Sequence, residues 1–96
     1  MAEKRTARIL VVDDDPGIRR FLRMALTADG YQVFEAATGQ AGLEGVVAHR
    51  PDLVILDVML PKMSGFDVLR KARERGVATP VIMLTARHRV EDRVRG

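Results

Sequence analysis

The segment Ile9-Leu10-Val11-Val12-Asp13-Asp14-Asp15-Pro16 decides the fold of this 96-residue chain. Its first half is a short, continuous apolar run rich in β-branched residues, which is typical of a strand buried on both faces of a sheet. Its second half offers Asp14 or Asp15 as the cap of a helix, with Pro16 suited to the first helical turn. The segment therefore predicts a buried strand that leads directly into a helix.

The same alternation continues along the chain. Apolar runs at 53–56 and 81–84 predict two further strands buried on both faces, and the mixed run at 32–36 predicts an edge strand. A first helix is predicted from the helical spacing of five apolar residues, and it should stop at Asp29-Gly30. Those five residues are Ile18, Phe21, Leu22, Ala25 and Leu26.

Two more helices complete the pattern. Thr38 is suited to cap a second helix, and Ser64 a third that ends at Gly76. A fourth helix is expected to start within residues 89–96. Strands that alternate with helices predict an α/β fold with a doubly wound parallel sheet.

Composition limits the class of protein. The length and the 47% hydrophobic content predict one domain spanning residues 1–96, with no second domain. The sequence has no cysteine, which excludes a disulfide framework and thiolate metal sites. No run approaches the ~20 apolar residues that cross a bilayer, and the start of the chain does not resemble a signal peptide. A cytoplasmic protein without a membrane partner is expected.

The charge is balanced along the chain. Sixteen basic and thirteen acidic residues give a net charge of +3, and arginines alternate with acids along the expected helix faces. This pattern is typical of solvated surfaces that carry ion pairs, and no nucleic-acid recognition motif accompanies it. We therefore expect no direct contact of this segment with nucleic acid.

The last predicted strand raises a question of completeness. It is as apolar as the central strands, yet no later run in the chain could pair with its outer edge. Because exposed apolar edges promote association, we expect a C-terminally incomplete domain that forms a homodimer or a strand-swapped oligomer.

Acidic residues follow two of the predicted strands. Asp13 and Asp14 end the first strand and Asp57 ends the third. In an open parallel sheet, ligands bind beyond the carboxyl ends of the strands, so these carboxylates should meet if the two strands are neighbours. Such a cluster is tolerable only when it is protonated or neutralised by a cation, and its oxygen ligands favour Mg²⁺. Helix capping is the alternative role, and it suits Asp15 best.

Three motifs resemble a known family. Residues 9–19 (ILVVDDDPGIR), 52–65 (DLVILDVMLPKMSG) and 80–87 (PVIMLTAR) are similar to the receiver domain of two-component response regulators, in the order and spacing of that family. The resemblance covers the chain after Arg8. The residues of the last two motifs are most similar to those of the OmpR-like subfamily of transcription factors. It implies the flavodoxin-like strand order 2-1-3-4, with the fifth strand and its helix absent from these residues.

The resemblance also implies roles. Asp57 would be the phosphoacceptor for a sensor histidine kinase, and the reaction would depend on Mg²⁺. The cation would be bound by Asp14, Asp57 and the carbonyl of Met59, and Asp13 would hold one of its waters. Thr85 and the amide of Ala86 would contact the phosphoryl group, and Pro61 and Gly65 would shape the adjacent loop. A lysine that the family places after its fifth strand is not found in this sequence, nor is an output domain.

Three functions remain open on the sequence. The first is a phosphorylation-switched signalling domain that catalyses only its own phosphorylation and dephosphorylation. The second is a truncated or engineered assembly fragment without phosphotransfer. The third is a Mg²⁺-dependent phosphohydrolase of the haloacid-dehalogenase type, in which Asp13 and Asp15 would form the Asp-x-Asp pair, although Gly17 stands where that family has a hydroxyl residue.

Overall fold

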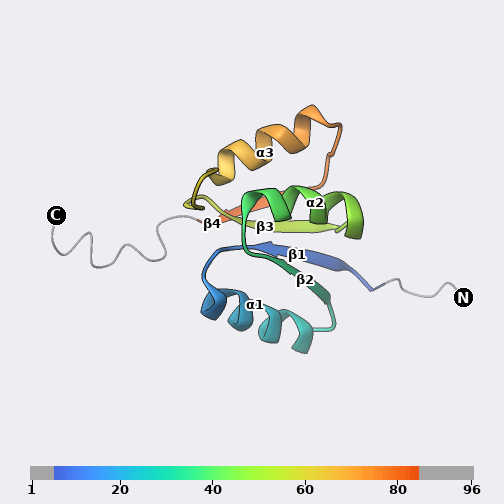
Figure 1. Ribbon diagram of the computed structural model, residues 1–96. Coiled ribbons are helices and arrows are strands. Elements are labelled where there is room, and N and C mark those ends of the chain that lie inside the picture. The colour runs from blue at the N-terminus through green and yellow to red at the C-terminus, as the bar shows by residue number, and fades with distance from the viewer. Residues whose placement is uncertain (1–5, 85–96) are drawn as a thin grey trace, which may run out of the picture.

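Residues 6–84 are described by the computed structural model, and they form a four-stranded sheet with helices on both faces (Figure 1). Its strands are β1 (Arg8–Val12), β2 (Gln32–Ala36), β3 (Leu53–Asp57) and β4 (Val81–Leu84). Its helices are α1 (Pro16–Ala28), α2 (Gly39–His49) and α3 (Gly65–Glu74). All strand pairs are parallel and the order is β2-β1-β3-β4. The predicted fold class and strand order are confirmed, and the helix expected within 89–96 lies outside the described residues.

Alternation of side chains along β1 divides the core in two. Leu10 and Val12 face α2 and α3, where they join the larger buried cluster. Ile9 and Val11 face the opposite side and pack near Leu22 of α1. In Figure 1, α2 and α3 accordingly lie on one side of the sheet and α1 on the other. This arrangement buries both faces of β1, as the apolar run predicts.

One expectation about burial is wrong, and one residue of the first helix lies at the surface. The strand at 81–84 is expected to be buried on both faces, but Ile82 of β4 is 51% exposed, because within residues 6–84 α1 packs mainly against β1 and β2 rather than over β4. Phe21 shares the helical spacing of the apolar residues of α1, yet it is 67% exposed. Leu22 and Leu26, one turn apart, are the α1 residues that pack against the sheet, and this orientation turns Phe21 to the surface.

The predicted capping residues all cap helices. Asp15 accepts hydrogen bonds from the amides of Gly17 (2.8 Å) and Ile18 (3.3 Å), and Thr38 accepts one from Ala41 (3.0 Å). Ser64 and Asp67 form a reciprocal capping box at the start of α3. These bonds satisfy amides that the first helical turn leaves without a partner.

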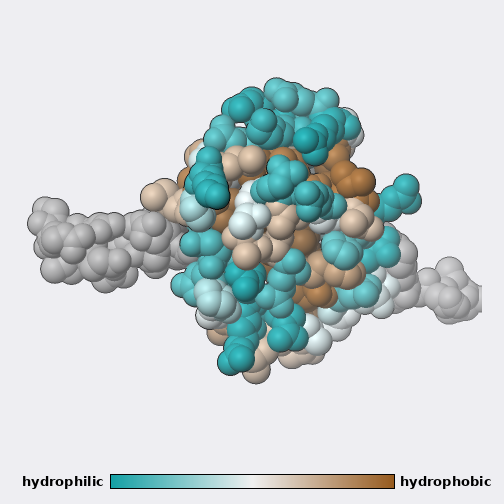
Figure 2. Space-filling model, viewed as in Figure 1, coloured by the Kyte–Doolittle hydropathy of each residue, from teal (hydrophilic) through white to brown (hydrophobic). Residues whose placement is uncertain are grey.

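Polar side chains cover much of the outer surface. In the view of Figure 2, hydrophilic residues gather over the outer face of α3 and around α1, and hydrophobic residues show between them. None of the helices within residues 6–84 is long and apolar enough to cross a membrane.

The capping box of α3 yields a stability prediction. The Arg70 guanidinium and the Ser64 amide, which donate to Asp67, hold the pKa of Asp67 below its usual value of 3.8. A lowered pKa in the folded state stabilises the fold above pH 3.8, and this contribution is lost as the pH falls through the lowered value.

Ser64→Ala should lower the free energy of unfolding by about 1 kcal/mol at pH 7, measured by urea denaturation. An unchanged midpoint at pH 7 would show that the capping box does not stabilise α3.

Candidate functional site

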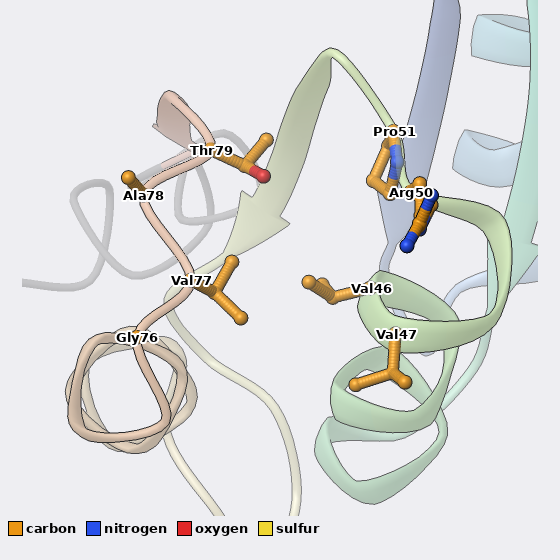
Figure 3. Close-up of a pocket in the computed structure, with 8 residues that line it drawn as sticks. All are labelled: Val46, Val47, Arg50, Pro51, Gly76, Val77, Ala78 and Thr79. Carbon is orange, nitrogen blue, oxygen red and sulfur yellow. The ribbon is translucent and has the colours of Figure 1, made fainter.

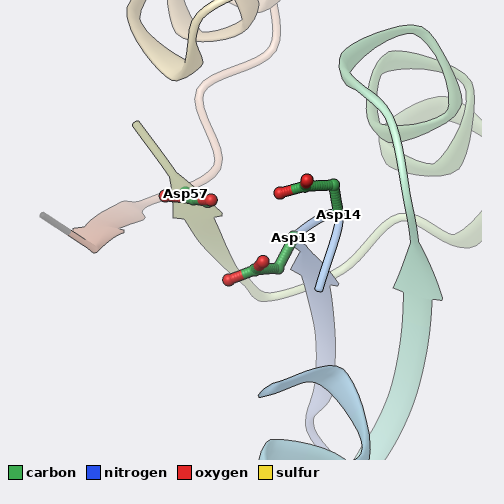
Figure 4. Close-up of side chains that lie close together, drawn as sticks. All are labelled: Asp13, Asp14 and Asp57. Carbon is green, nitrogen blue, oxygen red and sulfur yellow. The ribbon is translucent and has the colours of Figure 1, made fainter. Parts of the chain in front are cut away.

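The carboxyl ends of β1 and β3 form the candidate site. The two strands are neighbours, with Val12 paired to Leu56, so Asp13 and Asp57 follow at the same edge of the sheet. Asp14 comes next along the chain from Asp13. Carboxylate oxygens of the three residues lie within 4.8 Å of one another, and Figure 4 shows the side chains gathered beyond the two strand ends. The predicted convergence of Asp13, Asp14 and Asp57 is thereby observed.

The three carboxylates differ in exposure. Asp13 and Asp57 are fully buried, whereas Asp14 is exposed. The amide of Asp15 donates to Asp13 Oδ1 (2.9 Å), and the amide of Met59 donates to Asp57 Oδ1 (3.0 Å). These short-range hydrogen bonds orient each buried carboxylate at the point where its strand ends. The cluster is therefore fixed on two strands and open to solvent on the side of Asp14.

This donor set fits a hard divalent cation. Three carboxylates at such short separations repel one another, and a bound cation offsets that repulsion. Carboxylate oxygens are the ligands that Mg²⁺ and Ca²⁺ prefer, and an open site with few protein ligands suits Mg²⁺, which keeps several waters. The residues present are thus chemically suited to a divalent metal.

The loop after Asp57 packs tightly against the site. The amide of Gly65 donates to the carbonyl of Val58 (2.9 Å). A Cβ atom added at Gly65 would lie 2.4 Å from the backbone oxygen of Asp57, closer than real Cβ atoms approach. Glycine at this position therefore lets α3 begin directly against the backbone that carries Asp57.

The other predicted site residues have different outcomes. Met59 is half exposed, and its amide donates to Asp57; the role of its carbonyl as a metal ligand stays a prediction. Thr85 and Ala86 lie outside the described residues. Asp15 does not join the cluster of three acids, because its carboxylate caps α1.

One contact at the site was not predicted. Arg19 of α1 donates from Nη1 to the backbone oxygen of Asp13 (2.9 Å) and from Nε to Glu35 of β2 (3.1 Å). This contact has no signal in the sequence, which does not show that the side chain of an arginine six residues after Asp13 returns from α1 to the end of β1.

A pocket of about 460 Å³ lies elsewhere, between the end of α2 and the segment joining α3 to β4 (Figure 3). Pro51 precedes β3 and Thr79 precedes β4, so this pocket is at the amino ends of the strands, opposite the acidic cluster. In Figure 3, Val46 and Val77 point toward each other across it. Its lining contains no carboxylate. The acidic cluster is therefore the stronger candidate for a chemical site. The lining residues are Val46, Val47, Arg50, Pro51, Gly76, Val77, Ala78 and Thr79.

Comparison with known families matches residues 9–96 to the response regulator receiver domain. Among curated proteins, a probable transcriptional regulatory protein of Mycobacterium tuberculosis, TcrX, is 43% identical over 95 residues, covering 99% of this chain and 41% of that protein. The response regulator MprA of Mycolicibacterium vanbaalenii is 46% identical over 89 residues, covering 93% of this chain and 38% of that protein. The chain thus spans about two fifths of the length of these relatives.

Solved structures show the same architecture. The receiver domain of the Francisella response regulator 1452 superposes with a TM-score of 0.81 at 28% identity, covering 94% of this chain and 74% of that one. The N-terminal domain of a response regulator receiver protein from Methanoculleus marisnigri superposes with a TM-score of 0.81 at 39% identity, covering 83% of this chain and 67% of that one.

Proposed function

The chain belongs to the response regulator receiver domain family, and we propose that within this family it is a phosphorylation switch in which Asp57 accepts the phosphoryl group. Membership confirms the resemblance drawn from the three sequence motifs. It makes the chain a two-component signalling domain rather than an enzyme that turns over a separate substrate. The observation that carries the proposal is the cluster of Asp13, Asp14 and Asp57 at one sheet edge.

The geometry suits Asp57 to be the nucleophile. It is the last residue of a central strand, it is fully buried, and the Met59 amide orients its carboxylate. A carboxylate oxygen of Asp57 would attack the phosphorus of a phosphohistidine, forming an O–P bond as the P–N bond breaks. The histidine nitrogen leaves with the bonding electron pair and takes up a proton. The product is an aspartyl phosphate at the edge of the sheet.

A divalent cation would be held by the same residues. Asp14, Asp57 and the carbonyl of Met59 are the proposed direct ligands, and Asp13 would hold a bound water. When bound, Mg²⁺ supplies positive charge that offsets the repulsion between the anionic nucleophile and the anionic phosphoryl group. The proposed contacts of Thr85 and Ala86 with the phosphoryl oxygens complete the site.

The partners follow from the family. A sensor histidine kinase is the proposed phosphodonor. Because TcrX is named a probable transcriptional regulatory protein, we propose that the whole protein controls transcription in the manner of the OmpR-like subfamily, through a part outside these 96 residues. The segment itself would not contact nucleic acid.

The phosphohydrolase alternative is disfavoured by the position of Asp15. That mechanism needs the second acid of the Asp-x-Asp pair beside the first, but the Asp15 carboxylate is bonded to the amides of Gly17 and Ile18. The decisive experiment is incubation with acetyl phosphate and Mg²⁺, monitored by intact mass, in parallel with p-nitrophenyl phosphate turnover. We expect stoichiometric addition of one phosphoryl group and no sustained turnover. Sustained turnover would establish the hydrolase. The absence of both labelling and turnover would favour the assembly fragment.

Metal binding gives a separate prediction. Titration of the chain with Mg²⁺ should shift the NMR signals of Asp13, Asp14 and Asp57 together, because their oxygens converge. Asp14→Asn should weaken binding by about tenfold or more, because loss of a residue that only supports a metal ligand already costs that much and Asp14 is a proposed direct ligand. Shifts confined to Asp15 and α1 would contradict the assignment of the ligands.

A further inference from the structure

Arg19 joins the acidic cluster to the neighbouring strand. Its side chain is only 20% exposed, and its guanidinium bonds both the Asp13 carbonyl (2.9 Å) and Glu35 of β2 (3.1 Å). Glu35 is also paired with Arg23, one turn further along α1, at 2.7 Å. The guanidinium is therefore held in place by a carboxylate that is itself bonded by two arginines.

The bond to the Asp13 carbonyl acts on the position of Asp14. The carbonyl of Asp13 and the amide of Asp14 belong to one planar peptide unit. A bond to that oxygen therefore restrains the orientation of the peptide plane that leads into Asp14. The preceding peptide is fixed by the Asp13 amide, which donates to the Ala36 carbonyl (3.0 Å). Within residues 6–84, no hydrogen bond to the carboxylate of the exposed Asp14 is found, so among the observed contacts only those of the backbone restrain the direction in which this side chain leaves the chain.

We propose that Arg19 is a positioning residue for the metal site: through the Asp13 carbonyl, it fixes the Asp13–Asp14 peptide so that the Asp14 carboxylate points to Asp57. This inference rests on the proposed metal-dependent phosphoacceptor site. The observed bonds of the Arg19 guanidinium go to the Asp13 carbonyl and Glu35, so in this role Arg19 would touch neither the cation nor the phosphoryl group. The rigid guanidinium fork is required because it bonds the carbonyl and Glu35 at the same time, which a lysine ammonium on a flexible stem does poorly.

The two possible roles of Arg19, positioning and simple electrostatics, predict opposite changes in Mg²⁺ affinity when Arg19 is replaced. Arg19 brings a positive charge near the acidic cluster, so removing that charge alone should tighten the binding of a cation. Removing a positioning bond should weaken binding, because Asp14 then samples orientations that do not converge with Asp57. The sign of the change therefore distinguishes the two roles.

Arg23 provides a matched control on the same helix. It carries the same charge and pairs with the same Glu35, but it has no described bond to the Asp13 backbone. Arg19→Gln, Arg19→Lys and Arg23→Gln of the full 96-residue chain should be compared in two measurements. The first is the Mg²⁺ dissociation constant from NMR titration, and the second is the ¹⁵N order parameter of the Asp14 amide without metal.

The expected loss of Mg²⁺ affinity is about 3- to 10-fold for Arg19→Gln, the size of the net contribution of one ordinary hydrogen bond. Arg19→Lys should lose affinity in the same direction, and Arg23→Gln should not. The Asp14 order parameter should fall from about 0.85 toward 0.6 in the Arg19 variants only. Unchanged or tighter Mg²⁺ binding by Arg19→Gln, or an equal loss in Arg23→Gln, would overturn the proposal. If the unaltered chain binds no Mg²⁺, the proposed function fails, and the order parameter alone still decides whether Arg19 fixes Asp14.

Discussion

Replacement of Asp57 by asparagine should abolish the Mg²⁺-dependent phosphorylation of the chain. Asparagine has nearly the same shape as aspartate, and its side-chain oxygen can still accept the hydrogen bond from the Met59 amide. The fold around the end of β3 should therefore persist. The amide lacks the anionic oxygen that attacks phosphorus. Intact mass after incubation with acetyl phosphate should therefore show no added phosphoryl group in Asp57→Asn, against one in the unaltered chain.

Asp15→Asn is the matched control for that experiment. It makes the same chemical change at an acid that lies next to Asp14 in the sequence but outside the cluster, where it caps α1, and asparagine caps helices about as well as aspartate. Labelling of Asp15→Asn should equal that of the unaltered chain. Phosphorylation that survives Asp57→Asn, or is lost in Asp15→Asn, would move the chemistry to another residue.

Substitution of Gly65 should produce the largest structural effect. The added Cβ of Gly65→Ala would lie 2.4 Å from the Asp57 backbone oxygen and 2.9 Å from Val58 Cα. Both are backbone atoms, so α3 or the end of β3 must shift. We expect the free energy of unfolding to fall by about 1–3 kcal/mol, the usual cost of overpacking, and phosphorylation of the remaining folded protein to slow. Urea denaturation and the labelling rate measure the two effects.

Gly17→Ala is the control for the glycine substitution. Its Cβ would meet only the Asp15 carboxylate at 3.2 Å, and Gly17 is exposed in the first turn of α1. Its stability should change by no more than about 0.5 kcal/mol. If Gly65→Ala is as stable as Gly17→Ala and is labelled at the normal rate, the close approach of α3 does not support the site.

Local chemistry made much of the fold predictable. Apolar runs identified the strands, and capping depends on residues next to the helix, so Asp15, Thr38 and Ser64 were found from the sequence. The order of the strands depends on distant pairings, and it came from the family resemblance rather than from the residues. Burial of β4 depends on which elements cover it, and here the apolar run misled; the exposure of Phe21 depends on its neighbours in the same way, and helical spacing did not address it.

The candidate site likewise has residues that the sequence predicts and contacts that it does not. Asp13, Asp14 and Asp57 were identifiable because parallel strands bring their carboxyl ends to one edge. The bond of Arg19 to the Asp13 carbonyl was not, because it joins a helix side chain to a backbone oxygen across a turn whose path only the folded chain reveals. The close contact of Gly65 with Asp57 likewise requires the position of α3 against β3.

The most direct test of the account locates the phosphoryl group. The chain is phosphorylated with acetyl phosphate and Mg²⁺ and then reduced with borohydride, which converts an aspartyl phosphate to homoserine, and peptides are sequenced by mass spectrometry. The account predicts homoserine at position 57 alone, and none when the metal is removed with a chelator before the phosphodonor is added. Homoserine at position 13 or 14, or equal labelling without metal, would contradict it.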